Sequence, residues 1–484
     1  MNGGATLVGV LVTLPLAAAI LAFLWPRRAA ATSVAGGALV LLAAAMLVFQ
    51  VYRDGPWRMD IGGWAVPLGI AWNVDGLAAG MILLAAAVAI AGAAFHAQSP
   101  VNSGGGRDPA LFWPLWLFLW GCLNALFLSA DLFNLYVTLE FVAIASVGLI
   151  ALAGDAARAA AWRYLLATLL GSSIYLLGVA LLYGLHATLD IALLATLTEP
   201  DLVSAVAALL ITLGLLLKAA VFPLHFWLPA AHGRASPGVS AILSGVVVAA
   251  AYYLLLRLWP GPFAVLLDSG AGLLLGLLGA GGVIWGGVQA LLQRHLKMLV
   301  AYSTVAQLGY VLMMIPLLAT EGAVQAGHGA SMLVLSHGLA KAALFLAAGA
   351  VVLHHGHDRL DALAGAGSAT RLAWVAFALA AASLVGLPPT GGFIGKWWLA
   401  QAALAGDTLL WVAVLVLGTL LTAAYLWRAL RIAARPADPL PQPAATLPPL
   451  LPWGALLLAT AALALGLAAP LAEALLHQQA EGGA

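Results

Sequence analysis

The sequence is a succession of apolar runs, each about 20 residues long and bounded by charge, proline or glycine. A run of this length matches one helix across a lipid bilayer. Fourteen are present, at residues 5–25, 33–52, 73–95, 111–130, 131–153, 162–184, 202–223, 238–257, 271–293, 298–318, 325–353, 372–402, 409–433 and 449–475. Only 8% of the residues are charged, against about 25% in a soluble domain. The sequence therefore predicts an all-α polytopic membrane protein with about fourteen transmembrane helices.

Arginine and lysine are distributed unevenly over the loops between these runs. Of the 19 basic residues, thirteen follow odd-numbered runs and only three, Arg53, Arg58 and Arg257, follow even-numbered ones. Basic residues concentrate in short cytoplasmic loops. We therefore expect the loops after odd-numbered runs in the cytoplasm and both termini on the outer side of the membrane.

The three remaining basic residues are lysines inside apolar runs, Lys218, Lys341 and Lys396. A lysine at the centre of a membrane helix costs roughly 2.5–3.5 kcal/mol on insertion scales, so a buried ammonium is a functional hypothesis by default. The fourth lysine of the chain, Lys297, immediately precedes the 298–318 run, and we expect it at the cytoplasmic edge.

Prolines interrupt two of the runs that carry a lysine. Pro223 and Pro229 follow Lys218, and the pair Pro388–Pro389 precedes Lys396. Proline breaks the helical hydrogen-bond ladder, and paired broken helices occur at the ion sites of inverted-repeat transporters. We expect four segments: helices 1–3, two inverted five-helix repeats, and a last helix with a tail. Their ranges are 1–110, 111–257, 271–433 and 449–484.

Glu140 is the one acid that the sequence places deep in a run, and His337 lies four residues before Lys341, on the same helix face. Apolar surroundings disfavour both a charged carboxylate and a charged lysine, while pairing favours both. A buried Glu–Lys pair therefore has two protonation states of similar energy, as a proton relay requires. The alternative for Glu140 is a structural hydrogen bond between helices, and for His337 a bond to a neighbouring carbonyl.

Several smaller polar residues are candidates for ordering water between these groups. They are His225, His232, Ser240, Ser244, Ser303 and Thr304, although small polar residues also serve helix packing. The HHGHD cluster at 354–358 fits a metal-binding tract, and we favour a solvated loop there. The single Cys122 excludes an iron–sulfur cluster held by this chain alone. With no nucleotide or haem motif, we expect no cofactor and no metal.

Strings between about 70 and 402 together resemble the antiporter-like subunits of respiratory complex I, of Mrp-type cation/proton antiporters and of membrane hydrogenases. They include DLFNLYVTLEFVAIAS, LLLKAAVFPLHFWLP, SHGLAKAALFLAAGAV and GLPPTGGFIGKWWLA. The resemblance implies a gating pair of Glu140 and Lys218, a central relay of Lys341 with His337, and Lys396 near the exit. It also implies a bacterial inner-membrane location and other membrane subunits as partners.

Two positions depart from the family pattern. Ala230 stands where most relatives have an acid, in LPAAH, and the region around Ala249 lacks the usual bridging lysine. We predict a proton- or sodium/proton-translocating subunit similar to the D-type subunit of Mrp antiporters. Either water and His232 bridge the gap, or the subunit conducts by a modified route. The alternatives are a proton-pumping subunit of complex I or a hydrogenase, a subunit of an inorganic-carbon uptake complex, and a non-conducting scaffold. Partner chains would supply any redox chemistry.

Overall fold

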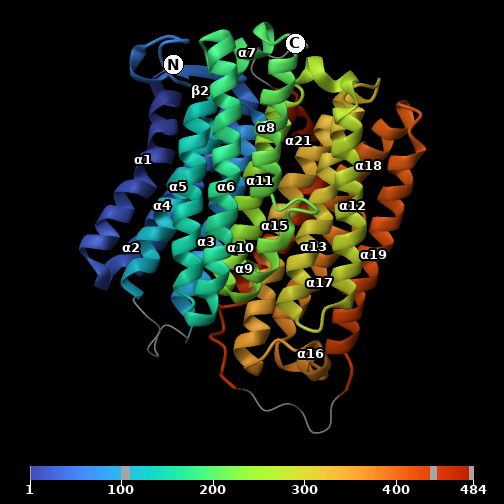
Figure 1. Ribbon diagram of the computed structural model, residues 1–484. Helices are drawn as coiled ribbons and strands as arrows, with labels where there is room; N and C mark the ends of the chain where they lie inside the picture. The colour runs from blue at the N-terminus through green and yellow to red at the C-terminus, as the bar shows by residue number, and fades with distance from the viewer. Residues whose placement is uncertain (1, 100–108, 437–443, 479–484) are drawn as a thin grey trace.

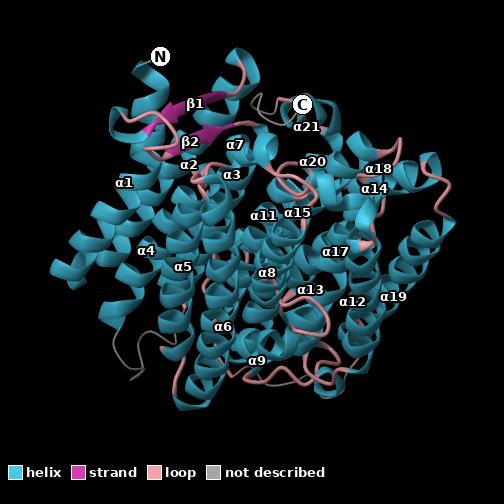
Figure 2. Cartoon of the chain, turned by 45° about the horizontal axis from the view of Figure 1, so that its top comes forward, coloured by secondary structure: helices cyan, strands magenta, loops and turns pink. Residues whose placement is uncertain are grey.

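The computed structural model describes residues 2–99, 109–436 and 444–478. Its helices run side by side along one direction and form a single bundle (Figure 1). A two-stranded sheet lies at one end of the bundle, where α1 begins and where α7 and α21 also lie (Figure 2). This end is called the hairpin end below.

The element order follows the predicted runs closely. The helices are α1 Asn2–Leu24, α2 Ala29–Asp54, α3 Gly76–Gln98, α4 Pro109–Leu128, α5 Leu132–Ala151, α6 Asp155–His186, α7 Ile191–Leu197, α8 Leu202–Lys218, α9 Leu228–Arg234, α10 Pro237–Ile242, α11 Val248–Leu258, α12 Ala271–Leu292, α13 Leu296–Leu312, α14 Met314–Leu317, α15 Ala323–His355, α16 Ala366–Ala369, α17 Arg371–Val385, α18 Gly391–Ala405, α19 Leu409–Ala433, α20 Trp453–Leu467 and α21 Ala469–Leu476. A π-helical turn, Leu243–Val247, joins α10 to α11 in one rod.

Eleven helices within the described residues are long and apolar enough to cross a membrane. They correspond to eleven of the fourteen predicted runs. The other three runs are the short α8, the pair α17 and α18, and the pair α20 and α21, which is bent by 77°. The chain is therefore a multi-pass membrane protein.

The strands were not predicted. β1 (Trp57–Asp60) pairs antiparallel with β2 (Ala71–Val74), with Trp57 opposite Val74. β1 alternates apolar and charged residues, but four residues are too few to distinguish a strand, and β2 overlaps the start of the next apolar run. The proline-rich 435–449 connector lies partly outside the described residues.

Both proline-interrupted helices end near a lysine. α8 ends at Lys218, and the indole N–H of Trp227, beyond the break, donates to the carbonyl of Leu217 at 2.9 Å. α17 ends at Val385, and the ammonium of Lys396 donates to the carbonyls of Leu384 and Val385 at 3.0 and 3.1 Å. Helix ends inside a membrane need such partners because no water is available to them.

One of the innermost elements, α15, carries the fully buried Lys341. α15 and the α10–α11 rod are wholly buried over their most apolar windows, whereas only a third of the corresponding windows of α1 and α2 is buried. α6 and α8 cross closely at Gly171 and Gly214, where an added Cβ on Gly214 would lie 2.4 Å from the Gly171 carbonyl oxygen. This crossing brings α6 directly against Lys218.

Candidate functional site

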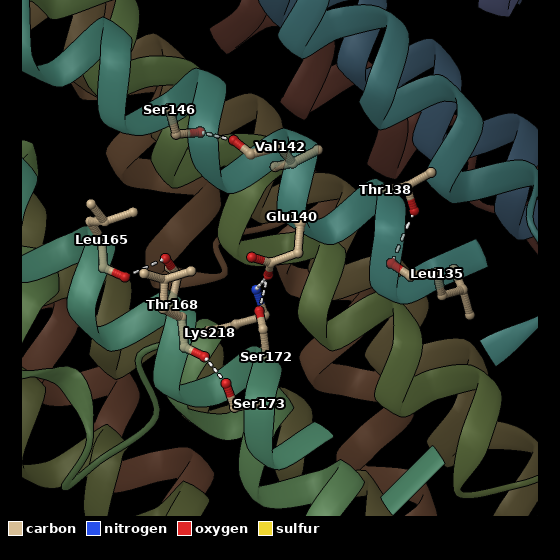
Figure 3. A network of polar contacts seen from close by, with 11 residues as sticks. Leu135, Thr138, Glu140, Val142, Ser146, Leu165, Thr168, Ser172, Ser173 and Lys218 are labelled. Atoms are coloured by element: carbon tan, nitrogen blue, oxygen red, sulfur yellow. Dashed lines mark hydrogen bonds and ion pairs between the residues drawn. The ribbon is translucent and has the colours of Figure 1, made fainter. Parts of the chain in front are cut away.

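Glu140 and Lys218 form a buried ion pair between α5 and the end of α8 (Figure 3). The Nζ of Lys218 lies 3.0 Å from Oε1 of Glu140, with side-chain exposures of 6% and 15%. The Ser172 hydroxyl of α6 donates to the same carboxylate oxygen. Charge-assisted hydrogen bonds of this kind are about twice as strong as neutral ones, so three helices meet at this carboxylate.

Lys341 lies deeper, at the middle of α15, and is fully buried. Its ammonium donates to the carbonyl of Val300 at 2.9 Å and to the hydroxyl of Ser303, both on α13. Beside it, the hydroxyls of Ser244 and Thr304 lie 2.8 Å apart. Lys341 is thus held by neutral oxygen atoms, in contrast to the paired Lys218.

Two buried histidines lie close to Lys341. His337 interacts electrostatically with Lys341 and with His232, and His232 interacts with Lys341 and Lys297. Among the described residues, neither ring nitrogen of either histidine has a well-formed hydrogen bond. Buried polar groups ordinarily find a protein or water partner, so these rings mark the polar centre of the bundle.

Lys396 is buried in α18, next to the break after α17. In addition to its two carbonyl partners, its ammonium donates to Thr419 of α19 at 3.2 Å. It also lies 4.7 Å from the centre of the Tyr310 ring on α13, a cation–π contact. Lys396 therefore bridges α17, α13 and α19.

A polar stripe between Lys341 and Lys396 was missed by the sequence reasoning. Gln307 of α13 donates to Thr422 of α19 at 3.0 Å, and the Tyr425 hydroxyl donates to the same threonine at 3.4 Å. Tyr425 also interacts with Ser303, the partner of Lys341. Thr419, Thr422 and Tyr425 are spaced by three along α19. That spacing was the available signal, because residues three apart share a helix face.

The supporting candidates have different roles. Ser303 and Ser244 lie at the Lys341 site, whereas the Ser240 hydroxyl donates to the carbonyl of His232 at 2.9 Å and so fixes the end of α9. His225 is half-buried and packs against the rings of Phe222 and Tyr302, apart from the lysines. In the 354–358 cluster His355 is buried, Gly356 is exposed and the other residues are partly exposed, and the preference for a solvated loop over a metal-binding tract stays a prediction.

Lys297 lies in the first turn of α13, at the helix edge where it was expected, but it is buried there. Lys297 is 7% exposed, and its ammonium donates to the carbonyl of Ala235 at 2.6 Å and to that of Gly233 at 3.4 Å. It therefore holds the carbonyl end of α9 against the start of α13. Its position at the edge of a run hid this role, because a lysine there can reach either water or a neighbouring helix.

Two further ion pairs at the hairpin end were missed as well. Arg257 of α11 forms a bidentate pair with the fully buried Asp75, the N-cap of α3, and also donates to the Tyr253 hydroxyl. Arg58 of β1 pairs with Asp190, the N-cap of α7. The loop pattern assigns both arginines to the outer side, and a linear sequence gives no indication of a partner more than a hundred residues away.

A bundle of long apolar helices that buries several ionisable side chains is typical of ion-translocating membrane proteins. The model of the NADH:quinone oxidoreductase/Mrp antiporter transmembrane family matches residues 129–422. The chain belongs to this family and is an antiporter-like membrane subunit.

Three comparisons place the chain among its relatives. It is 37% identical to NADH-quinone oxidoreductase subunit N of Desulforudis audaxviator (strain MP104C), over 85% of this chain and 82% of that protein. It is 30% identical to the D-type subunit of the Na(+)/H(+) antiporter of Alkalihalophilus pseudofirmus (strain ATCC BAA-2126 / JCM 17055 / OF4), over 79% and 77%. The structure of the Mrp complex from Dietzia sp. DQ12-45-1b contains a chain that superposes with a TM-score of 0.88 at 28% identity, covering 99% of this chain and 97% of that one.

The Arg257–Asp75 pair makes a testable contribution to stability. Replacing Arg257 with Gln leaves Asp75 buried without its countercharge, which typically costs about 3–5 kcal/mol. We expect a lower melting temperature for Arg257→Gln in detergent, measured by intrinsic tryptophan fluorescence. Arg53→Gln is the matched control, because Arg53 pairs with Asp54 on the exposed surface. This variant should melt like the wild type. Equal melting of the two variants would contradict a structural role for the buried pair.

Proposed function

We propose that this chain is a proton-translocating subunit, with sodium/proton antiport as its coupled form, in a multisubunit complex of the bacterial inner membrane. The observation that carries the proposal is the buried Glu140–Lys218 pair, set in one bundle with the unpaired lysines Lys341 and Lys396. Intramembrane ionisable groups are costly to keep and mark ion pathways.

The pair supplies a gate because its two partners stabilise each other only while both are charged. A proton that reaches Glu140 neutralises the carboxylate and leaves Lys218 as an unpaired buried ammonium, which is unfavourable. Releasing a proton from Lys218 toward the centre of the bundle removes that cost. We propose that Lys341 receives the proton as a neutral amine and becomes an ammonium, because its contacts in the described structure are neutral oxygens and no carboxylate holds it permanently charged.

Ala249 lies in the position where relatives place a bridging lysine, and its side chain is fully buried. We propose that His232 and ordered water replace that lysine. In support, His232 of α9 is fully buried and lies within electrostatic range of Lys341. A buried imidazole can accept a proton on one nitrogen and release one from the other, so it can pass a proton on without a second lysine.

The second half of the route would follow the polar stripe between α13 and α19. Ser303 contacts Lys341, and Tyr425, Thr422 and Gln307 interact with one another next to it. Hydroxyl groups both donate and accept hydrogen bonds and can therefore relay protons together with water. The stripe leads toward Tyr310 and Lys396, the proposed exit.

Each of the two proposed repeats contains a helix pair that is closed by a backbone bridge at an equivalent position. Asp131, at the start of α5, bridges Asp190 beyond α6, and His295, at the start of α13, bridges Arg359 beyond α15. α5 starts at the hairpin end, whereas α13 starts at the opposite end of the bundle (Figure 1). The two bridges therefore close equivalent helix pairs that run in opposite directions, in support of two inverted five-helix repeats.

Counting residues back from the two bridges also relates the Glu140 site to the Lys341 site. Ser172 lies 18 residues before Asp190, and Lys341 lies 18 residues before Arg359. The residue that contacts Glu140 in one half thus corresponds to the central lysine of the other half. Such a relation is what one duplicated helix pair would leave after its two copies acquired separate roles.

The proposal also covers the number of membrane spans, the orientation of the chain in the membrane and its partners. We propose fourteen spans, with the hairpin end and both termini on the periplasmic side. The orientation is supported by the basic residues, which concentrate in the loops of the opposite end. Other membrane subunits and lipid would cover the exposed apolar faces of α1, α2 and α19, which include Phe49, Leu420 and Trp427.

A second candidate is the same channel driven by a redox complex. The 37% identity to an NADH-quinone oxidoreductase subunit N favours this function, and partner chains would then carry the redox centres. Inorganic-carbon uptake and a non-conducting scaffold are two further functions that the family pattern allows. Neither has a specific observation in its favour beyond the missing lysine near Ala249.

The gating pair can be tested in reconstituted vesicles that contain the complete complex. Glu140→Gln and Lys218→Ala should each lower ion-coupled proton flux by tenfold or more, equivalent to about 1.4 kcal/mol or more in barrier height. The reason is that neither variant can hold the two charge states of the pair. Proton flux is measured with a pH-sensitive dye after a sodium or voltage step.

Ser173→Ala is the control for this pair, since Ser173 lies beside Ser172 on α6 but donates to the carbonyl of Leu169 on the exposed face. It should transport like the wild type. Wild-type flux in fully assembled Glu140→Gln complexes would exclude the pair as a gate.

The polar stripe is tested by removing single polar atoms. Tyr425→Phe and Gln307→Leu should each slow proton flux, because each interrupts the contact between the Lys341 site and Thr422. Tyr183→Phe removes the same hydroxyl from an exposed tyrosine of α6 and should have no effect. If all three variants transported equally, the second half of the route would have to lie elsewhere.

Ala249→Leu addresses the gap between the two halves. The larger side chain would fill any space beside α11 that holds water, so we expect slower flux with unchanged assembly. Ala249→Gly, which keeps the space open, is the matched control. Unchanged flux in Ala249→Leu would show that no water path passes this position.

A further inference from the structure

A second group of ionisable side chains lies at the hairpin end, outside the line from Glu140 to Lys396. It consists of His328 in the second turn of α15 and of Glu473 and His477 at the end of α21. Each offers one ligand atom, and the three atoms lie within 4.8 Å of one another. Among the described residues this is the one group of three His, Cys, Asp or Glu side chains that meets this criterion.

The chain holds these residues in place from both sides. Glu473 and His477 are four residues apart, and the amide of His477 donates to the carbonyl of Glu473 at 2.9 Å, so their side chains share one face. The rings of His328 and His477 are edge to face, with centres 4.2 Å apart. His328 is 7% exposed and also packs against Trp398 at 6.1 Å.

The segment that carries His477 is fixed to the start of α3. The amide of Gly76 donates to the carbonyl of Gln478 at 3.1 Å, and the Gln478 side chain donates to the carbonyl of Tyr52 at 3.1 Å. An added Cβ on Gly76 would lie 1.8 Å from the carbonyl oxygen of Leu475. Only glycine permits this approach, and it locks the end of α21 against α3 and α15.

Two of the three residues lie at a cavity of about 530 Å³, and the third, Glu473, lies 4.0 Å from His477 outside the lining. His328 and His477 line it, together with Ser331 of α15 and the two arginines Arg58 and Arg257. The arginines are neutralised by Asp190 and Asp75, so they oppose a bound cation only weakly. His477 and Glu473 remain about half exposed, at 56% and 46%, so an ion can reach them from water.

We propose that His328, Glu473 and His477 form a binding site for a divalent transition-metal ion of the zinc class. Two imidazole nitrogens and one carboxylate oxygen are a ligand set for Zn²⁺, with water in the fourth position. Ligand atoms around tetrahedral zinc lie about 3.3 Å apart, given bonds of about 2.0 Å. Small rotations of Glu473 and His477, which are exposed, close the present spacing to that value.

The ligand chemistry also selects among cations. Mg²⁺ and Ca²⁺ prefer sites made of oxygen atoms, whereas imidazole suits zinc, copper and nickel. We therefore expect Zn²⁺ to bind and Mg²⁺ and Ca²⁺ not to compete at millimolar concentration.

A metal bound by these residues would add positive charge to the cavity and obstruct it. It would also tie α15, which carries Lys341, to α21. The consequence, which rests on the proposed function, is that Zn²⁺ inhibits proton transport from the hairpin side. Metal binding itself does not depend on transport.

The site is tested by metal binding to the purified full-length chain, stripped of metal with a chelator. Co²⁺ serves as the spectroscopic probe, because tetrahedral Co²⁺ absorbs strongly in the visible range, and Zn²⁺ competition then gives the zinc affinity. His328→Ala, His477→Ala and Glu473→Gln should each weaken Zn²⁺ binding by at least about tenfold, since loss of an outer-shell partner alone costs 10–100-fold.

Two further variants make the outcome decisive. Glu473→His restores a three-nitrogen set and should retain binding, which a merely structural role for Glu473 would not predict. His186→Ala removes a half-buried histidine of α6 near the same end and should bind like the wild type. If wild-type and ligand variants bind Zn²⁺ equally, an adventitious ion only is present and the proposal is wrong.

Transport measurements distinguish the proposed metal site from the proposed function in proton transport. Zn²⁺ added to the hairpin side of vesicles should inhibit wild-type flux, and this inhibition should need at least tenfold more Zn²⁺ in His477→Ala. Zinc binding without inhibition would retain the metal site and reject its position on the transport route. Loss of flux in Glu140→Gln with unaltered zinc binding would support both the proposed function and a metal site that is independent of it.

Discussion

An ammonium group in the interior of this bundle has no bulk water to solvate it, and the arrangement of the core depends on how each lysine is satisfied. Lys218 is paired with Glu140, whereas Lys341 and Lys396 are held by hydroxyl and carbonyl oxygens from neighbouring helices. Each solution requires two or three helices to meet at one point. The lysines therefore fix helix packing as well as carrying the proposed chemistry.

The broken helices follow from the same requirement. A continuous helix uses its carbonyls in its own ladder, and such a carbonyl can accept at most one more hydrogen bond, as Val300 of α13 does from Lys341. The end of a helix offers carbonyls that have no partner in the ladder. The end of α17 releases the carbonyls of Leu384 and Val385 for Lys396, and the end of α9 releases those of Gly233 and Ala235 for Lys297. Proline breaks thus create, inside the membrane, the polar partners that a lysine needs there.

Charge separates the molecule into two regions with different roles. In the centre the buried lysines lie among carboxylate, hydroxyl and carbonyl oxygens of neighbouring helices, where we propose that the proton is transferred. At the hairpin end Arg257 and Arg58 are locked to the N-caps Asp75 and Asp190, and arginine does not release its proton in proteins. These pairs join α11 to α3 and β1 to α7, so they stabilise the frame around the cavity without entering the relay.

The sequence by itself determined the class of protein, the apolar runs, the proline breaks and the identity of the charged residues. Those features depend on local hydrophobicity and backbone chemistry, which a linear reading contains. Only the tertiary structure decided which charges meet: the partners Arg257 and Asp75 are separated by 182 positions, and Lys297 is buried although it lies at the edge of a run. The polar stripe on α13 and α19, and the cluster of His328 with Glu473 and His477, likewise arise where distant helices face one another. Helix rotation and packing set those contacts, and a hydrophobic pattern that covers every face of a helix cannot specify its rotation.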